Sequence, residues 1–190
     1  MNGQLENRRV RMTKRLMKDA LLELLEQSDL SNISVMALCQ TADVHRSTFY
    51  KYYTCPAELL QEIEQDVLDR IPSASPLLNR QDEEDLIGAT ASFFDYAREN
   101  QQAFRVLFSE SANAGFSCRL VDLLCKQMAS VTENGDDPSS MFVLNYIANG
   151  SIGMLRAWLN SGFPLSSREM GEMIVSFSRK LTNQSFPSVS

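Results

Sequence analysis

Hydrophobic residues recur at helical spacing through the first part of the chain. Between Thr13 and Glu26 they form a stripe that predicts an amphipathic helix. The stripe consists of Leu16, Met17, Ala20, Leu21, Leu24 and Leu25. A second apolar set, Val35, Leu38, Cys39 and Ala42, follows Ser34, whose hydroxyl suits the capping of a short helix that begins at Val35.

A third short helix is predicted after a tight turn at Asp43, a residue type that tolerates the left-handed backbone conformation. Val44, Phe49 and Tyr52 supply its apolar face. The polar positions are His45, Arg46, Ser47, Thr48 and Lys51. Two short helices joined by a tight turn, with Cys39 as the small residue at their crossing, predict a helix-turn-helix. An ordinary helical hairpin is the alternative, but it would not favour hydroxylated and cationic residues on its outer face.

Helical spacing continues to the end of the chain, and no strand pattern competes with it. Apolar positions predict helices over 57–71, 86–97, 104–108, 118–128, 141–159 and 170–181. Prolines and serines between Pro72 and Gln81 predict a linker, and Gly162 to Pro164 predict a helix stop before a restart at Ser166. The predicted fold class is all-α, with a helix-turn-helix head over 1–55, a connecting helix over 56–71 and a helical effector and dimerisation domain over 72–190.

Charge is distributed unevenly along the chain. The whole sequence carries a net charge of −6, which argues against a nucleic-acid partner until the charges are placed. Residues 1–55 carry eight Lys and Arg against six Asp and Glu, a net of +2, and the remainder carries ten against eighteen, a net of −8. Within residues 1–18 six cations face only Glu6, so only this end of the chain suits a polyanion.

The composition excludes several classes of protein. With 44% hydrophobic and 22% charged residues, and no apolar run near the ~18 residues of a membrane span, the chain is expected to be cytoplasmic and free of membrane. Four cysteines and one histidine show no metal-ligand spacing, so no metal or cofactor is expected. Reduced, buried thiols are the expectation and a thiol redox sensor the alternative. Without a phosphate loop or nucleophile elbow the chain is not expected to be an enzyme, and only carboxylate chemistry is left open.

The third helix has the chemistry of a major-groove reader. Ser47 and Thr48 are short enough to bring the backbone close to DNA, and Arg46 suits a forked contact to guanine. Tyr50, Lys51, Tyr52 and Tyr53 are expected to meet phosphates, although the Tyr52 ring also fits the inner face. The predicted DNA-contacting residues are Arg15, Ser34, His45, Arg46, Ser47, Thr48, Tyr50, Lys51, Tyr52 and Tyr53. Arg15 belongs to a stripe with Arg11, Lys14 and Lys18, for which a merely solvated face is the alternative.

The run from Val44 to Tyr53, followed by Glu58, Leu59 and Leu60, resembles the DNA-binding head of TetR/AcrR-type regulators over roughly residues 10–62. Asp43, His45 and Pro56 depart from the family's usual turn glycine, serine and lysine. The resemblance implies an all-helical homodimer that binds a near-palindromic operator on double-stranded DNA. The segment from Asn149 to Leu165 resembles a Gram-positive branch of the family, some of whose members act with a protein partner.

Two further sites are predicted in the body. A surface on the last two helices resembles the family's four-helix dimer interface, with intrachain core as the alternative. Its residues are Phe142, Tyr146, Gly150, Gly153, Ala157, Met170, Ile174, Phe177 and Leu181. A pocket for a small apolar effector is predicted among Phe93, Phe104, Phe108, Tyr146 and Trp158, again with core as the alternative. The predicted function is a homodimeric repressor released by an effector, and the alternative is a co-regulator whose body binds a partner protein.

Overall fold

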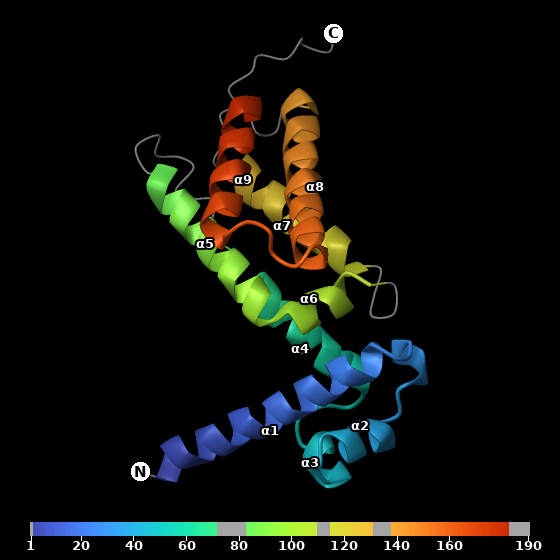
Figure 1. Ribbon diagram of the computed structural model, residues 1–190. Helices are drawn as coiled ribbons and strands as arrows, with labels where there is room; N and C mark the ends of the chain where they lie inside the picture. Colours follow the sequence, from blue (N-terminus) through green and yellow to red (C-terminus); the bar gives the residue numbers. More distant parts are fainter. Residues whose placement is uncertain (1, 72–82, 110–114, 131–137, 183–190) are drawn as a thin grey trace. The chain divides into compact units, whose positions relative to one another are not determined.

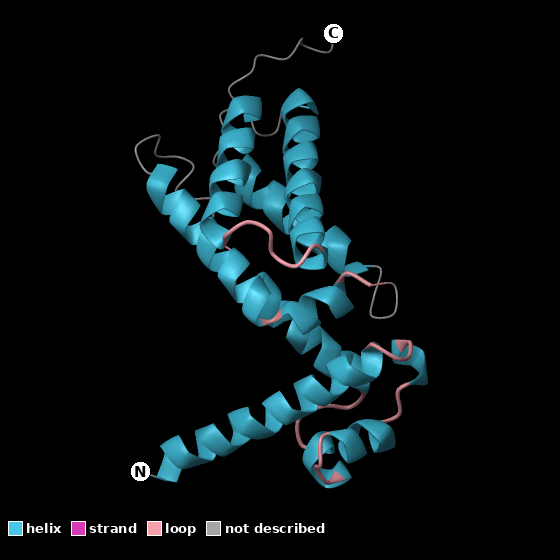
Figure 2. Ribbon diagram, in the orientation of Figure 1, coloured by secondary structure: helices cyan, strands magenta, loops and turns pink. Residues whose placement is uncertain are grey.

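The computed structural model describes residues 2–71, 83–109, 115–130 and 138–182, and over these residues every regular element is a helix (Figures 1 and 2). The helices are α1 (Asn2–Leu25), the 3-10 helix η1 (Leu30–Asn32), α2 (Val35–Thr41), α3 (Arg46–Tyr50), α4 (Pro56–Leu68), α5 (Glu83–Glu99), α6 (Gln101–Leu107), α7 (Gly115–Ala129), α8 (Pro138–Asn160) and α9 (Ser167–Thr182). The all-α prediction is confirmed. The predicted linker over 72–81 lies outside the described residues.

The chain divides into two compact units. The first comprises Met1–Asp69 with Gln102–Ala114, and the second comprises Arg70–Gln101 with Gly115–Ser190. The predicted connecting helix therefore clusters with the head, and most of α6 joins it. For α4 the physical reason is its inner face, where Leu59, Leu60, Ile63 and Val67 are buried in a helix that packs against α1. Among the described helices, none is both long and apolar enough to cross a membrane.

The first unit is built around a small core shared by its first helices. Met17 and Leu21 of α1, Leu38 of α2 and Phe49 of α3 are fully buried. Helix α4 begins at Pro56, where the missing N–H costs nothing. The Thr54 backbone N–H donates to the Glu58 carboxylate at 2.7 Å, which fixes the start of α4 and lowers the pKa of Glu58.

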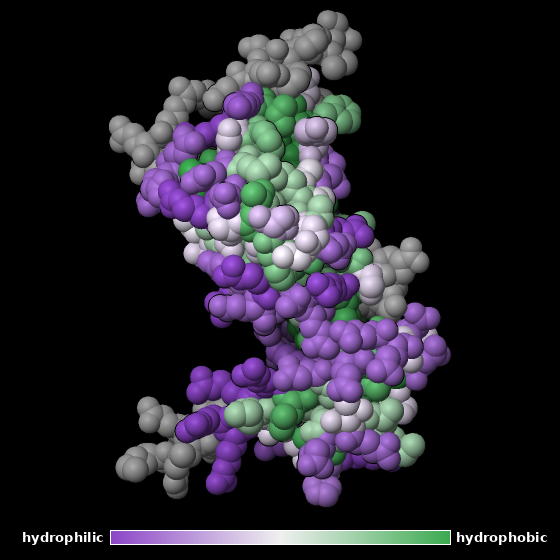
Figure 3. All heavy atoms as spheres, in the orientation of Figure 1, coloured by the Kyte–Doolittle hydropathy of each residue, from purple (hydrophilic) through white to green (hydrophobic). Residues whose placement is uncertain are grey.

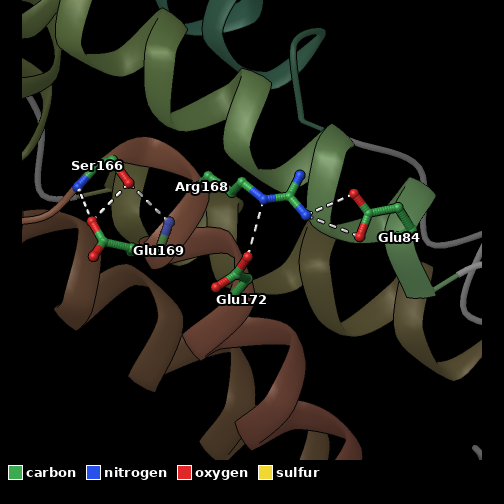
Figure 4. Close-up of polar contacts among 5 residues, drawn as sticks. All are labelled: Glu84, Ser166, Arg168, Glu169 and Glu172. Atoms are coloured by element: carbon green, nitrogen blue, oxygen red, sulfur yellow. Dashed lines mark hydrogen bonds and ion pairs between the residues drawn. The ribbon is translucent and has the colours of Figure 1, made fainter.

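In the second unit, α5 and α9 approach closely. An ideal Cβ added at Gly171 would lie 2.9 Å from the backbone oxygen of Ile87, so this position accepts only glycine without a backbone shift. Ion pairs flank the contact: Arg168 of α9 bonds Glu84 of α5 at 2.7 Å (Figure 4). Arg179 of α9 also bonds Glu83 of α5. Met170, next to Gly171, is buried as well, whereas Glu172 on its other side is exposed.

The connection from α8 to α9 is fixed by local chemistry. Gly162 and Phe163 both adopt positive φ, which ends α8 as the sequence predicted. The Trp158 indole then donates to the Leu165 oxygen at 2.8 Å. Ser166 and Glu169 exchange hydrogen bonds in a capping box that starts α9, which Figure 4 shows beside Arg168. The predicted stop and restart are both confirmed.

Candidate nucleic-acid interface

The turn between α2 and α3 has the geometry of a helix-turn-helix. Ser34 caps α2 by accepting a hydrogen bond from the Ala37 N–H at 3.1 Å. Asp43 adopts the left-handed conformation with φ 51°, and the Val44 N–H then donates back to the Cys39 oxygen at 3.0 Å. The expected small contact residue, Cys39, is buried at the crossing, where burial raises the pKa of its thiol.

The outer face of α3 is polar and open to solvent. His45 occupies the N-cap position and is exposed, as are Arg46 and Ser47, whereas Thr48 is half-buried. Phe49, on the opposite face, is fully buried. Among the described residues neither Arg46 nor Lys51 has an ion-pair partner. Arg46 and Ser47 therefore form the most accessible polar surface of the turn.

The aromatic end of α3 splits between surface and core. Tyr50 and Lys51 are exposed, and the Lys51 ammonium lies 5.6 Å from the centroid of the half-buried Tyr52 ring. Tyr53 does not join them, because it is 3% exposed and its ring lies 5.7 Å from that of Phe49. The structure thus places Tyr53, one of the predicted DNA-contacting residues, inside the first unit.

Tyr53 takes part in a polar network that joins α1 to α4. The Glu62 carboxylate accepts hydrogen bonds from the Tyr53 hydroxyl at 2.9 Å and from the Lys14 ammonium at 2.8 Å. Lys18 bridges Glu62 at 2.8 Å and Asp66 at 2.6 Å. We call Lys14, Lys18, Tyr53, Glu62 and Asp66 the seam network.

The seam network shifts the ionisation of its members in consistent directions. Burial alone would raise the pKa of Glu62, but the hydrogen bonds from Lys14, Lys18 and Tyr53 outweigh it and lower that pKa to about 2. Burial would lower the pKa of Lys18, yet Asp66 and Glu62 raise it. Burial, with the bond to Glu62, raises the pKa of Tyr53. Glu62 is therefore ionised at neutral pH, and Lys18 is held as a cation beside it.

The remaining cations of α1 have looser surroundings. Arg15 has a side chain that is 78% exposed and lies 3.7 Å from Asp19, a distance typical of a weak surface pair. Three further arginines, Arg8, Arg9 and Arg11, are exposed and form no ion pair with any described residue. The sequence could not distinguish these two populations, because the partners of Lys14 and Lys18 lie 48 residues away along the chain.

The predicted dimer face is mostly exposed. On α8, Phe142 and Tyr146 are 75% and 69% exposed, and Gly150, Gly153 and Ala157 are also open to solvent. On α9 the prediction was wrong in part, because Met170 is buried and Ile174 lines an internal cavity. Phe177 is exposed and Leu181 half-buried. Met173, which the sequence analysis missed, is exposed one turn before Phe177, as its spacing from Phe177 could have indicated.

The second unit holds an apolar cavity of about 140 Å³. Phe93 lines it, but the other four predicted pocket residues lie elsewhere. Phe104 and Phe108 cluster with the first unit, Tyr146 is exposed, and Trp158 packs between the rings of Phe94 and Phe163. The walls include Leu86, Phe94, Leu120, Leu124, Ile152 and Val175, with Thr90, Gln127, Ser151 and Ser178 as the polar groups.

Two of the four cysteines are buried, as the sequence analysis expected. Cys39 and Cys125 are buried, whereas Cys55 and Cys118 are exposed, and all four are free thiols. Over the described part of the chain, no three His, Cys, Asp or Glu residues are grouped so as to hold a metal ion.

Comparisons place both units among known proteins. A family model for a TetR-type transcriptional regulator C-terminal region matches residues 84–180. The TetR transcriptional regulator from Streptococcus agalactiae 2603V is 20% identical, with a TM-score of 0.62 over 93% of this chain and 98% of that chain. The dihydroxyacetone kinase operon activator DhaS is 20% identical, with a TM-score of 0.59 over 88% of this chain and 94% of its own.

A third solved structure is NalD, the secondary repressor of the MexAB-OprM multidrug efflux pump in Pseudomonas aeruginosa. It is 16% identical, with a TM-score of 0.56 over 88% of this chain and 94% of that chain. At these identities the likeness shows the fold alone. No match is found among curated protein sequences.

The seam network predicts a pH-dependent contribution to stability. We expect Glu62→Gln to lower the free energy of unfolding at pH 7 by about 1–2 kcal/mol, since a partly exposed carboxylate retains only part of the energy that its shifted pKa implies. The folded pKa lies below the ordinary value, so this contribution is complete above about pH 4.5 and is lost as the pH falls towards about 2. The difference between the variant and the wild type should narrow over that range.

Urea unfolding at several pH values measures the effect. Asp69→Asn is the matched control, because Asp69 also belongs to the first unit and, among the described residues, its carboxylate accepts a side-chain hydrogen bond from Gln65 alone. Equal stability of Glu62→Gln and wild type at pH 7 would show that the seam network is energetically neutral.

Proposed function

The chain belongs to the TetR family of transcriptional regulators, and on this premise we propose that it binds DNA sequence-specifically as a homodimer and represses transcription until an effector binds. The observation that carries the proposal is the outer face of α3, where Arg46 and Ser47 are exposed above the buried Phe49. A rigid, polar and cationic helix that projects from a packed core is what major-groove reading requires.

The proposed roles follow from the geometry. Arg46 and Ser47 read base edges, with His45 and Thr48 beside them at the start of α3. Tyr50, Lys51 and Tyr52 meet the phosphate backbone, where hydroxyl and ammonium donors suit the oxygens. Ser34 and Arg15 lie at the edges of the same unit, Ser34 as the cap of α2 and Arg15 as an exposed cation of α1. Tyr53 supports this surface from inside through Phe49 and Glu62.

The sign of regulation is part of the proposal. Structurally similar proteins include an operon activator, DhaS, and a repressor, NalD. A co-regulator whose body binds a partner protein is the second candidate, and the exposed apolar face of α8 is the observation that allows it. Repression predicts that deletion of the gene raises transcription from promoters that contain the bound sequence.

The dimer is proposed to form through α8 and α9. These helices lie side by side, and apolar atoms gather over them on the face seen in Figure 3. Phe142, Tyr146, Met173 and Phe177 supply the exposed apolar side chains. Nothing lies within 4 Å of a Cβ added at Gly150 or Gly153, so one chain alone leaves the middle of α8 open to a close partner. A self-complementary helix pair would bury this face.

The cavity of the second unit is the proposed effector site. Its volume of about 140 Å³ is close to that of an engineered protein cavity of ~150 Å³ that binds benzene. None of the described residues that line it is charged, and burying an unpaired charge there would be costly. The proposed effector class is therefore a small uncharged molecule, mostly apolar, with a polar group for Ser151, Ser178 or Gln127.

Base reading by Arg46 is directly testable. Selection of bound duplexes from a random pool supplies an operator, and fluorescence anisotropy then compares it with a random-sequence duplex. We expect Arg46→Ala to lower the preference for the operator by about 1–3 kcal/mol, because a forked contact to guanine is lost. Lys51→Gln should weaken both duplexes alike, and Arg98→Ala, at an exposed arginine of the second unit, should change neither. Unaltered affinity and preference in Arg46→Ala would refute the assignment of α3.

The dimer face is tested by placing a charge on it. Tyr146→Glu should raise the dimer dissociation constant at least about tenfold, because two unpaired carboxylates would be buried at a symmetric interface. Tyr50→Glu is the matched control at an exposed tyrosine of the other unit, and it should leave the dimer intact. Analytical ultracentrifugation measures both. A dimer that is unaffected by Tyr146→Glu places the interface elsewhere.

Phenol probes the cavity, because it has one ring and one hydroxyl and no charge. We expect phenol to raise the melting temperature in a concentration-dependent way, and the anion benzoate to have no such effect. Ser151→Phe, which adds a ring to the cavity wall, should abolish the phenol effect, whereas Ser92→Phe, at an exposed position of α5, should retain it. Stabilisation by phenol that persists in Ser151→Phe would show that phenol binds at another place.

A further inference from the structure

The Lys14 ammonium lies next to the end of the reading helix α3. It is 5.8 Å from the centroid of the Tyr52 ring, and Lys51 approaches the same ring to 5.6 Å. Two ammonium groups therefore flank one aromatic ring at the part of α3 that is proposed to meet phosphates. Lys14 and Lys51 therefore lie at similar distances from the Tyr52 ring.

The two lysines differ in their partners. Lys51 is exposed and forms no ion pair with a described residue. Lys14 is 31% exposed and its ammonium bonds the Glu62 carboxylate at 2.8 Å. A phosphate that approaches Lys14 has to compete with a carboxylate that is already in contact, and displacing Glu62 would remove one donor from a partly desolvated anion.

Lys18 cannot replace Lys14 in this role. Its side chain is only 18% exposed and its ammonium lies between Glu62 and Asp66. The two lysines and the two carboxylates of the seam network together carry no net charge. The available cations of α1 are therefore its arginines, towards the N-terminal end and at Arg15.

Counterion release makes this arrangement measurable. The logarithm of a DNA-binding constant falls with the logarithm of salt concentration by about 0.9 for each phosphate neutralised on duplex DNA. A lysine that remains paired to a carboxylate adds nothing to this slope. Such contacts do not depend on sequence, so their removal weakens binding to all DNA and leaves a larger share of the affinity to base contacts.

We propose that Glu62 limits the sequence-independent part of DNA binding: by holding Lys14 in an ion pair beside Tyr52, it removes one phosphate contact per subunit from the DNA-binding surface. The proposal rests on the proposed DNA-binding function. It assigns Glu62 a role in addition to its structural one, and that additional role is visible in salt dependence and not in stability.

The test measures binding of a random-sequence duplex by fluorescence anisotropy over a range of salt concentrations. Glu62→Gln should steepen the salt slope by about 0.9 for each bound subunit and tighten binding about five- to tenfold per subunit near 0.1 M salt, since Lys14 is released to a phosphate. Asp69→Asn removes the same charge from the first unit without freeing a cation, and its slope should equal that of the wild type. A slope unchanged in Glu62→Gln overturns the proposal.

A second pair of variants decides the matter even if Glu62→Gln folds poorly. Lys14→Gln in the otherwise native chain should leave the slope unchanged, whereas Lys51→Gln should reduce it by about 0.9 for each bound subunit. The double variant Glu62→Gln with Lys14→Gln should return to the native slope. A reduction of about 0.9 per subunit in Lys14→Gln alone would show that Lys14 already contacts phosphate and would overturn the proposal.

Failure of this inference is distinguishable from failure of the proposed function. If the wild-type chain binds no duplex, or if Arg46→Ala leaves sequence preference intact, the DNA-binding assignment fails and this inference with it. A different outcome refutes only the role of Glu62. In that case the wild type binds DNA and Arg46→Ala lowers sequence preference, but the salt slope is unchanged in Glu62→Gln and is reduced in Lys14→Gln.

Discussion

A helix of five residues has no stability of its own, so everything proposed for α3 depends on the packing that holds it. Nucleating a helix costs more than one turn of hydrogen bonds returns. Tertiary packing stabilises α3 instead. Phe49 is fully buried, the Tyr53 ring packs on Phe49, and the Tyr53 hydroxyl donates a hydrogen bond to Glu62 of α4. The direction in which Arg46 points is thus determined by two aromatic rings and one carboxylate.

The parts of this arrangement that sequence could predict are local ones. The cap at Ser34, the left-handed turn at Asp43 and the helix stop at Gly162 each depend on the backbone within a few residues, and the structure has all three. Burial of Phe49 followed from periodicity alone, because the outer face of the same helix is polar. Local chemistry and a single period sufficed for the helix-turn-helix.

What sequence missed depended on partners distant in the chain. Periodicity indicates which residues share a face, but not which face meets another helix. In sequence, Lys14 belongs to the same cationic stripe as the arginines of α1, and only its ion pair with Glu62, 48 residues away, distinguishes it from them. Tyr53 continued an aromatic run, yet its burial follows from the packing of α4. The predicted pocket failed for the same reason: aromatic residues are large enough to fill the core wherever it lies, so their number says little about where a cavity remains.

Two helical glycines show that a packing partner cannot be inferred from the sequence pattern alone. Gly171 and Gly153 both interrupt apolar helices, and only Gly153 has a role predicted from the sequence, at the dimer face. In the structure, a Cβ at Gly171 would meet the Ile87 backbone at 2.9 Å, whereas a Cβ at Gly153 would meet nothing within 4 Å. Glycine in a helix interior lowers stability by roughly 1 kcal/mol relative to alanine, so a helical glycine without a close contact calls for another explanation. Gly171 is required by a contact within the chain, whereas no such contact explains Gly153, which in the proposed dimer would face α8 of a second copy.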